Sequence, residues 1–150
     1  MVELLEQIRK CYKTNKKDKA LYKKILKAYF RYLTDKFPVK YKSEKADDVA
    51  KEKGIPLYKM TWQNQTKWDK KRELFHYEHC NPISELIEDV LETNRKIEDI
   101  IKDDYVCWIL KTEDEKLNKK GFRSERRKYG GWEECYKKCE IEILDNKEEN

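Results

Sequence analysis

The clearest hydrophobic pattern in the chain lies between residues 82 and 101. Its apolar residues recur at intervals of three and four, which places them on one stripe of an amphipathic helix with an acidic opposite face. The stripe consists of Ile83, Leu86, Ile87, Val90 and Leu91. Asn81 suits the N-cap and Pro82 the first helical position, where a missing N–H costs nothing. The pattern predicts a helix that packs on a core, with a break near Asn94 before the apolar face resumes.

Two more amphipathic segments precede this helix. Residues 2–12 predict a short helix, and residues 17–37 predict a long one that ends before Pro38, because proline disfavours helix at the residue before it. In the long helix we expect one apolar stripe to face the core, with a second apolar row beside it. The stripe is Leu21, Ile25, Ala28, Tyr29 and Tyr32, and the second row is Leu26, Phe30 and Leu33.

The stretch from residue 43 to residue 75 is less regular. Ser43 is a plausible N-cap for a helix that stops at Gly54. Residues 55–62 could form a strand, and a short helix could follow, capped by a threonine and an aspartate. Trp62 and Trp68 are more readily explained as core anchors than as platforms for stacked bases.

Residues 105–110 form the best candidate strand, a short apolar run rich in β-forming residues. Thr112 and Glu115 have the spacing of a capping box for the helix that follows, and a last helix is expected over residues 132–139. The patterns together predict an α+β fold that is mainly α: a compact helical domain with a small β element.

Length and composition fit one folded unit. The 150 residues predict a single domain over 1–150, with a frayed polar tail from about residue 145. Charged residues make up 43% of the chain, which indicates a heavily solvated surface. Aromatic residues at 12% argue against disorder.

The net charge of +5 is unevenly distributed. Residues 1–45 carry 14 Lys and Arg against 5 Asp and Glu, a net +9, whereas residues 46–118 carry 12 against 17, a net −5. A basic amino-terminal part favours an anionic partner, most often nucleic acid. Lysines on solvated helix faces also explain part of the excess.

The sequence predicts a cytosolic protein. The amino terminus lacks the apolar core of a signal peptide, and no apolar run approaches the roughly 20 residues of a membrane span. The five cysteines are an odd number and form no CxxC pair, so we expect reduced thiols.

A basic segment near the carboxyl end is the best candidate for contact with phosphates. It consists of Arg123, Arg126, Arg127 and Lys128, preceded by Lys119 and Lys120. The alternative is that these arginines pair internally with carboxylates of the acidic middle of the chain.

The two histidines of the chain, His76 and His79, suggest a site. One reading is zinc binding, in which the HxxH spacing joins Cys135 and Cys139 in a zinc-stabilised module. A strand would oppose this, because it points residues 76 and 79 to opposite faces. A second reading is structural: each histidine simply makes hydrogen bonds in a partly buried position, and His79 helps to cap the following helix.

The third reading is nucleolytic. Residues Glu78-His79-Cys80-Asn81-Pro82 resemble the first motif of HNH-type ββα-metal nucleases, in which an acidic residue and a histidine end a strand shortly before a proline. The resemblance implies that Glu78 binds a divalent ion, Mg²⁺ or Mn²⁺, and that His79 is the general base for the attacking water. No histidine follows His79, so the later ligand would be Asn94 or an acidic residue, and His76 is a further candidate ligand.

We therefore expect a nucleic-acid-acting protein, with a metal-dependent, HNH-like endonuclease as the sharpest form of the hypothesis. The principal alternative is a noncatalytic regulator or inhibitor that binds nucleic acid or a protein partner. A zinc-stabilised binding module is a further alternative. None of these requires a membrane.

Overall fold

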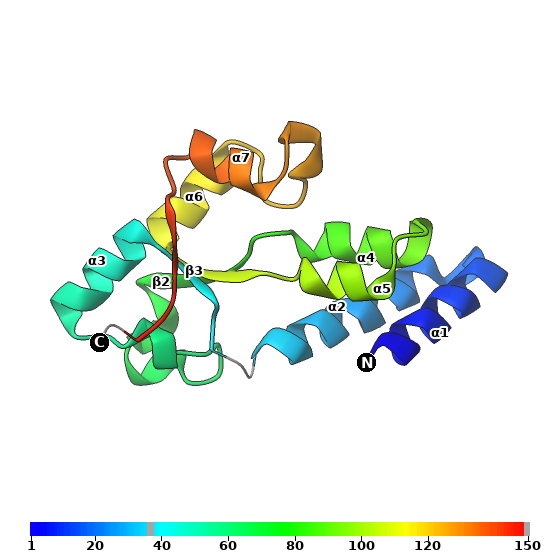
Figure 1. Cartoon of the computed structure of the whole chain (residues 1–150), viewed down its shortest axis with the longest axis horizontal. Coiled ribbons are helices and arrows are strands. Elements are labelled where there is room, and N and C mark those ends of the chain that lie inside the picture. Colours follow the sequence, from blue (N-terminus) through cyan, green and yellow to red (C-terminus); the bar gives the residue numbers. More distant parts are fainter. Residues whose placement is uncertain (36–37, 149–150) are drawn as a thin grey trace.

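The structure, a computed structural model, describes residues 1–35 and 38–148. Across this described part, 60% of the chain is helical and a four-stranded sheet accounts for 11%, which confirms the predicted α+β class with mainly α content. Figure 1 shows a group of helices at one end of the molecule and the sheet with the remaining helices at the other. The predicted end of the second helix, at residue 37, lies outside the described residues.

The helical end contains α1 (Val2–Thr14), α2 (Lys19–Asp35), α4 (Ile83–Glu92) and α5 (Ile97–Lys102). Its buried side chains form one hydrophobic cluster, to which all four helices contribute. The stripe predicted for α4 is confirmed, because its inner members are buried in this cluster and Ile83 packs at its margin. The buried α4 residues are Leu86, Ile87, Val90 and Leu91.

The predicted core stripe of α2 is wrong. Leu21 and Ile25 are 55% and 43% exposed, and Tyr32 is exposed as well, whereas Leu26 and Phe30 are completely buried. Both rows have the spacing of a helix face, and they lie about 100° or more apart around the helix axis. The helices α1 and α4 pack against the second row, and spacing alone cannot tell which row a neighbour will cover.

The sheet has the strand order β2-β3-β1-β4. Its strands are β1 (Tyr41–Ser43), β2 (Phe75–His79), β3 (Val106–Leu110) and β4 (Ile143–Asp145). Strand β3 confirms the strand predicted over residues 105–110, and β2 pairs with it in antiparallel register, with Phe75 opposite Leu110 and His79 opposite Val106. Strand β1 pairs parallel with β3 and antiparallel with β4. Among the described strands, β2 therefore lies at one edge of the sheet.

The two faces of the sheet are covered by different elements. The covering helices are α3 (Glu44–Lys53), α6 (Lys111–Lys119) and α7 (Trp132–Lys138). On one face α3 and the segment 55–74 pack with Tyr77 and Trp108 in a second cluster of buried side chains. On the other face α6 and α7 pack with Cys107 and Ile109 in a third cluster. The alternation of side chains along β2 and β3 thus divides this end of the molecule into two cores.

Local capping follows the prediction in one helix and departs from it in two. Ser43 caps α3, because its Oγ accepts a hydrogen bond from the Ala46 N–H at 3.1 Å, and Gly54 ends the helix at φ 64°. The box predicted for α6 is displaced: the Glu113 carboxylate accepts the Leu110 N–H at 2.9 Å and the Ser43 hydroxyl at 2.6 Å. Because β3 runs directly into α6, the helix begins one residue before Thr112, the expected cap.

The N-cap of α4 also differs from the expected one. It is Pro82 and not Asn81.

Residues 55–62 do not form a strand. The segment between α3 and β2 instead makes short 3-10 turns, held by the buried Asp69, whose carboxylate accepts the backbone N–H groups of Glu73, Leu74 and Phe75. The 3-10 turns of the described chain are Lys16–Asp18, Leu57–Lys59, Gln65–Lys67, Lys70–Arg72 and Arg127–Tyr129. The expected frayed tail is ordered at its start, because Asn146 donates hydrogen bonds to the carbonyls of residues 39 and 57 at 2.8 and 3.0 Å.

Candidate active site

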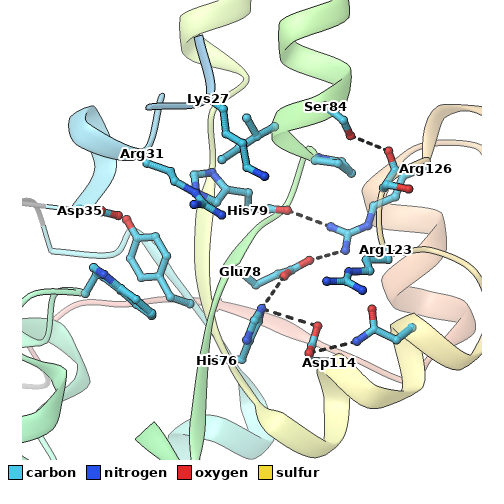
Figure 2. A pocket seen from close by; sticks show the side chains of 16 residues that line it. Lys27, Arg31, Asp35, His76, Glu78, His79, Ser84, Asp114, Arg123 and Arg126 are labelled. Atoms are coloured by element: carbon cyan, nitrogen blue, oxygen red, sulfur yellow. Dashed lines mark hydrogen bonds and ion pairs between the residues drawn. The ribbon is translucent and has the colours of Figure 1, made fainter. Parts of the chain in front are cut away.

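A cleft of about 670 Å³ lies over the edge strand β2 (Figure 2). Lys27 and Arg31 of α2 line one side, and Asp114 of α6 and Arg123 line another. The cleft therefore lies between the helical end of the molecule and the end built around the sheet. A second cavity, of about 180 Å³, is much smaller.

Strand β2 supplies functional side chains in alternation. His76 and Glu78 project towards α6, and His79 projects to the other face (Figure 2). The ring of Tyr77 packs against that of His79, with 5.7 Å between the centroids. The sequence reading that a strand would point the two histidines apart is confirmed. The Glu78 and His79 pair of the HNH-like hypothesis thus lines one cleft from opposite faces of a single strand.

His76, Glu78 and Asp114 form a possible ligand set for a metal ion. The distance from His76 Nε2 to Glu78 Oε2 is 3.1 Å, the distance to Asp114 Oδ1 is 3.6 Å, and all three ligand atoms lie within 4.8 Å of one another. An ion with bonds of about 2.1 Å places neighbouring ligand atoms about 3.0–3.5 Å apart. The spacing fits a divalent ion once His76 carries its proton on Nδ1, which leaves Nε2 as a ligand.

Glu78 is buried and is engaged by a second residue, Arg126. The Arg126 guanidinium, whose side chain is 2% exposed, forms an ion pair with Glu78 Oε1. Burial alone would raise the pKa of Glu78, but the hydrogen bond from His76 and the charge of Arg126 outweigh it, so the pKa lies below its ordinary value. Glu78 is consequently an ionised carboxylate, the form that a metal ion requires.

Arg126 also ties two chain segments together. Its Nε donates to the Phe122 carbonyl at 2.8 Å, and its NH1 donates to the carbonyls of His79 and Cys80 at 2.9 and 2.7 Å. The planar guanidinium thereby satisfies backbone acceptors at the junction between β2 and α4. This geometry makes Arg126 a positioning residue for Glu78.

His79 is held by a carboxylate on the other side of β2. Its Nδ1 lies 3.0 Å from Asp104 Oδ1, and both side chains are mostly buried. A carboxylate partner at one ring nitrogen fixes the orientation of the imidazole and leaves the other nitrogen to accept a proton. The arrangement suits a general base.

Two neighbours of His79 in the cleft have altered acidity. Burial raises the pKa of Asp35, and burial raises the pKa of Tyr77 even more. Tyr77 therefore remains a neutral phenol at neutral pH.

The cleft carries cations that suit an anionic ligand. Lys27, Arg31 and Arg123 are exposed and line it, and none of the salt bridges found between described residues involves them. Their charges remain available to phosphate groups. Of the basic segment predicted to contact phosphates, Arg123 is the member that lines the cleft with an exposed side chain.

The other members of that segment are placed differently. Arg126 is buried as described, and Arg127 pairs with Asp89 of α4, with NH1 2.6 Å from Oδ1. For Arg126 the structure corrects the expected surface role, because the side chain is buried. Both arginines pair with carboxylates of the acidic middle of the chain, as the alternative expected, but the side chain of Arg127 is still 46% exposed. Lys128 pairs with the exposed Glu125. Lys119 and Lys120 are exposed at the end of α6, where Lys120 donates to the carbonyl of residue 138.

Asn94 is not part of the site. It lies beyond the far end of α4, whose ten residues span about 15 Å, and its Oδ1 accepts a hydrogen bond from Lys13. The HxxH and CxxxC zinc arrangement is also not formed by the described residues. Cys135 and Cys139 are buried in the third cluster, where burial raises the pKa of both thiols, and the ligand set found near His76 contains no cysteine.

The sequence reasoning missed Asp114, Asp104, Lys27 and Arg31. Asp114 stands in the first turn of the helix that directly follows β3, and the antiparallel pairing of β3 with β2 brings that turn beside the start of β2. Without the strand register, no local signal distinguishes Asp114 from its acidic neighbours. One indication of Asp114 was present in the sequence: the HNH-like hypothesis allowed an acidic residue as the later metal ligand.

Comparison with known proteins gives no relative: no family model, no curated protein and no solved structure matches this chain. In the described residues, none of the helices combines the length and the apolar character that crossing a membrane requires.

Proposed function

We propose that the chain is a divalent-metal-dependent nuclease whose active site is the cleft over β2. One observation carries the proposal: a His/Glu/Asp ligand set, a carboxylate-held histidine and three unpaired cations line the same cleft. Phosphodiester hydrolysis needs a Lewis acid, a proton acceptor for water and positive charge around the phosphate. Side chains suited to each of these roles are present.

The roles follow from the chemistry of each group. Glu78, Asp114 and His76 would hold Mg²⁺ or Mn²⁺, which would supply Lewis-acid chemistry for the phosphate and the attacking water. His79 accepts the proton of the attacking water, and Asp104 orients its ring and stabilises the imidazolium that forms. Relative to the HNH-like hypothesis, Glu78 and His79 keep their roles, and Asp114 replaces Asn94.

The anionic substrate is bound by Arg123 from one side of the cleft and by Lys27 and Arg31 from the other. These residues contact phosphates and carry no information about sequence, so the proposal is for binding through the nucleic-acid backbone. The affinity should accordingly fall with salt.

A noncatalytic nucleic-acid-binding regulator is the second candidate, and one observation favours it. Both oxygens of Glu78 already have partners, because Oε1 pairs with Arg126 and Oε2 with His76. Under this alternative the carboxylate only holds the cleft in shape. Binding without cleavage would then be the activity of the protein.

The decisive experiment compares two neighbouring residues of α6. Asp114→Asn should abolish the cleavage of single-stranded or plasmid DNA in Mg²⁺ or Mn²⁺ and weaken Mn²⁺ binding measured by calorimetry. Glu115→Gln, a substitution at the exposed next position, should leave both unchanged. His79→Ala should lower the turnover by about 10²- to 10⁴-fold with Mn²⁺ binding retained, as expected for loss of a general base.

The outcomes separate the candidates. If the parent protein binds nucleic acid but never cleaves it with either metal, the regulator is correct and the nuclease is wrong. If Asp114→Asn cleaves as fast as the parent, the ligand assignment is wrong. If His79→Ala does so, the base is another residue.

A further inference from the structure

Trp62 is the most exposed tryptophan of the chain, and it lines the cleft. Its side chain is 39% exposed, whereas Trp108 is completely buried and Trp68 and Trp132 are half-buried. The expectation that Trp62 is a core anchor is therefore wrong. A large apolar ring has been left open to solvent in the same cleft as the ligand set.

The turn that presents Trp62 is rigidly held. The Thr61 N–H donates to Asn64 Oδ1 at 2.7 Å, the Asn64 N–H donates to Thr61 Oγ1 at 3.3 Å, and Asn64 Nδ2 donates to the Lys59 carbonyl at 3.1 Å. These reciprocal bonds close the turn on both sides of the ring. The turn that presents Trp62 is thus preorganised.

A strained backbone places Arg72 on the indole. Lys71 and Arg72 have φ values of 59° and 56°, a left-handed conformation that non-glycine residues adopt at a cost. The Arg72 guanidinium lies 3.4 Å from the ring centroid of Trp62, and its NH1 donates to Gln65 Oε1 at 3.3 Å. Strain of this kind persists where the surrounding structure fixes it, and here it holds the guanidinium of Arg72 over the indole ring of Trp62.

The pair is connected to the strand that carries the ligand set. Gln65 is completely buried, and its Nε2 donates to the Phe75 carbonyl of β2 and to Asp69, each at 2.9 Å. The ring of Tyr77 packs beside Trp62 with 5.9 Å between the centroids. The platform and the ligand set are therefore built on the same strand.

We propose that the Trp62 and Arg72 pair stacks an unpaired base, so that the substrate is a single-stranded nucleic acid. This inference rests on the proposed function of the cleft. Indole and guanidinium planes are the surfaces on which bases stack, and the faces of bases in a duplex are already covered by their neighbours. A duplex could use the cations of the cleft but not the platform.

The test measures binding in EDTA, where no cleavage occurs. Fluorescence anisotropy compares a labelled single-stranded DNA, its blunt duplex and the same strand with abasic positions. The parent should prefer the single strand to both. Trp62→Ala should weaken single-strand binding by about 5- to 150-fold, the loss expected for one stacked base. It should leave duplex and abasic-strand binding unchanged.

Two further variants serve as controls. Trp62→Phe keeps an aromatic ring, although a smaller one, so its affinity for the single strand should lie between those of the parent and Trp62→Ala. Because it fills more of the space of the indole, it serves as the test variant if Trp62→Ala is unstable. Arg123→Ala should weaken the single strand and the duplex equally, and should flatten the slope of log affinity against log salt by about 0.7–0.9.

The result can distinguish this inference from the proposed nuclease. If the parent cleaves but Trp62→Ala and Trp62→Phe bind the single strand as tightly as the parent, stacking is wrong and the nuclease stands. If stacking behaves as expected but no metal supports cleavage, the nuclease is wrong and the platform stands. If the parent binds neither form of nucleic acid, both are wrong.

Discussion

Replacing Arg126 by methionine removes the cation from a buried ion pair while it keeps most of the side-chain volume. Glu78 then remains buried with His76 as its polar partner, and the carbonyls of Phe122, His79 and Cys80 lose their donor. Removing one partner of a buried pair costs about 3–5 kcal/mol of unfolding free energy. For a chain of this length that corresponds to a fall in melting temperature of about 6–20 °C.

The loss of unfolding free energy caused by Arg126→Met should depend on pH. In the parent the pKa of Glu78 is lowered in the folded state, so its stabilisation is present above the unfolded pKa of about 4.3 and disappears as the pH falls through the folded pKa. Without Arg126, burial dominates and raises the folded pKa above the unfolded one. The variant is then penalised most at neutral pH, and the gap in unfolding free energy between parent and variant should narrow as the pH falls from 7 to about 4, through the raised pKa of Glu78 in the variant.

Urea unfolding at pH 7 and at pH 4, followed by circular dichroism, measures both effects. Arg123→Met, at an exposed arginine of the same segment, should change stability by less than about 0.5 kcal/mol. The double substitution Glu78→Gln with Arg126→Met should recover part of the loss, because no unpaired charge remains. Equal stability of Arg126→Met and the parent at pH 7, or a gap that widens at pH 4, would refute the reasoning.

Two other predictions concern the fold. Ile25→Ala, on the exposed row of α2, should change the unfolding free energy by less than about 0.5 kcal/mol, whereas Leu26→Ala should cost about 2–5 kcal/mol in the same urea titration; the reverse order would mean that the other row faces the core. Ser43→Ala should lower the unfolding free energy by about 0.5–2 kcal/mol, because it removes the cap of α3 and a hydroxyl donor to Glu113. Thr112→Ala, at the position first expected to be a cap, should leave the melting temperature almost unchanged, and a larger effect at Thr112 than at Ser43 would contradict the observed capping.

Elements with one unambiguous apolar stripe, or with a continuous apolar run, could be predicted from the sequence. The helix α4 and the strand β3 are of this kind. The helix α2 was recognised but its buried row was not, since two adjacent rows have the same spacing. The strands β1 and β4 have three residues each, and their pairing depends on partners more than 60 residues away in the chain for β1 and about 100 for β4. Such nonlocal pairing leaves little local signal.

The candidate site, like the fold, could be predicted from the sequence only where the signal is local. Glu78 and the two histidines were recognised because their chemistry is concentrated in four adjacent residues. Asp114 and Arg126 reach Glu78 only through the register of β2 on β3 and the fold of the segment after α6, so the sequence could not associate them with it. The buried Arg126 shows the limit of reasoning from charge, because a run of basic residues does not reveal which of them turns inward.

The position of the cleft has a consequence for motion. Lys27 and Arg31 belong to the helical end, which has its own cluster of buried side chains, and Arg123 and Asp114 belong to the end built around the sheet. A polyanion that touched both ends would join two parts of the molecule that have separate clusters of buried side chains, without entering the interior of either. Binding of such a polyanion would therefore stabilise the boundary between the two ends against local unfolding. Protection of backbone amides from hydrogen exchange then rises along β2 and the first turn of α4, while the interiors of the two ends keep their own opening rates.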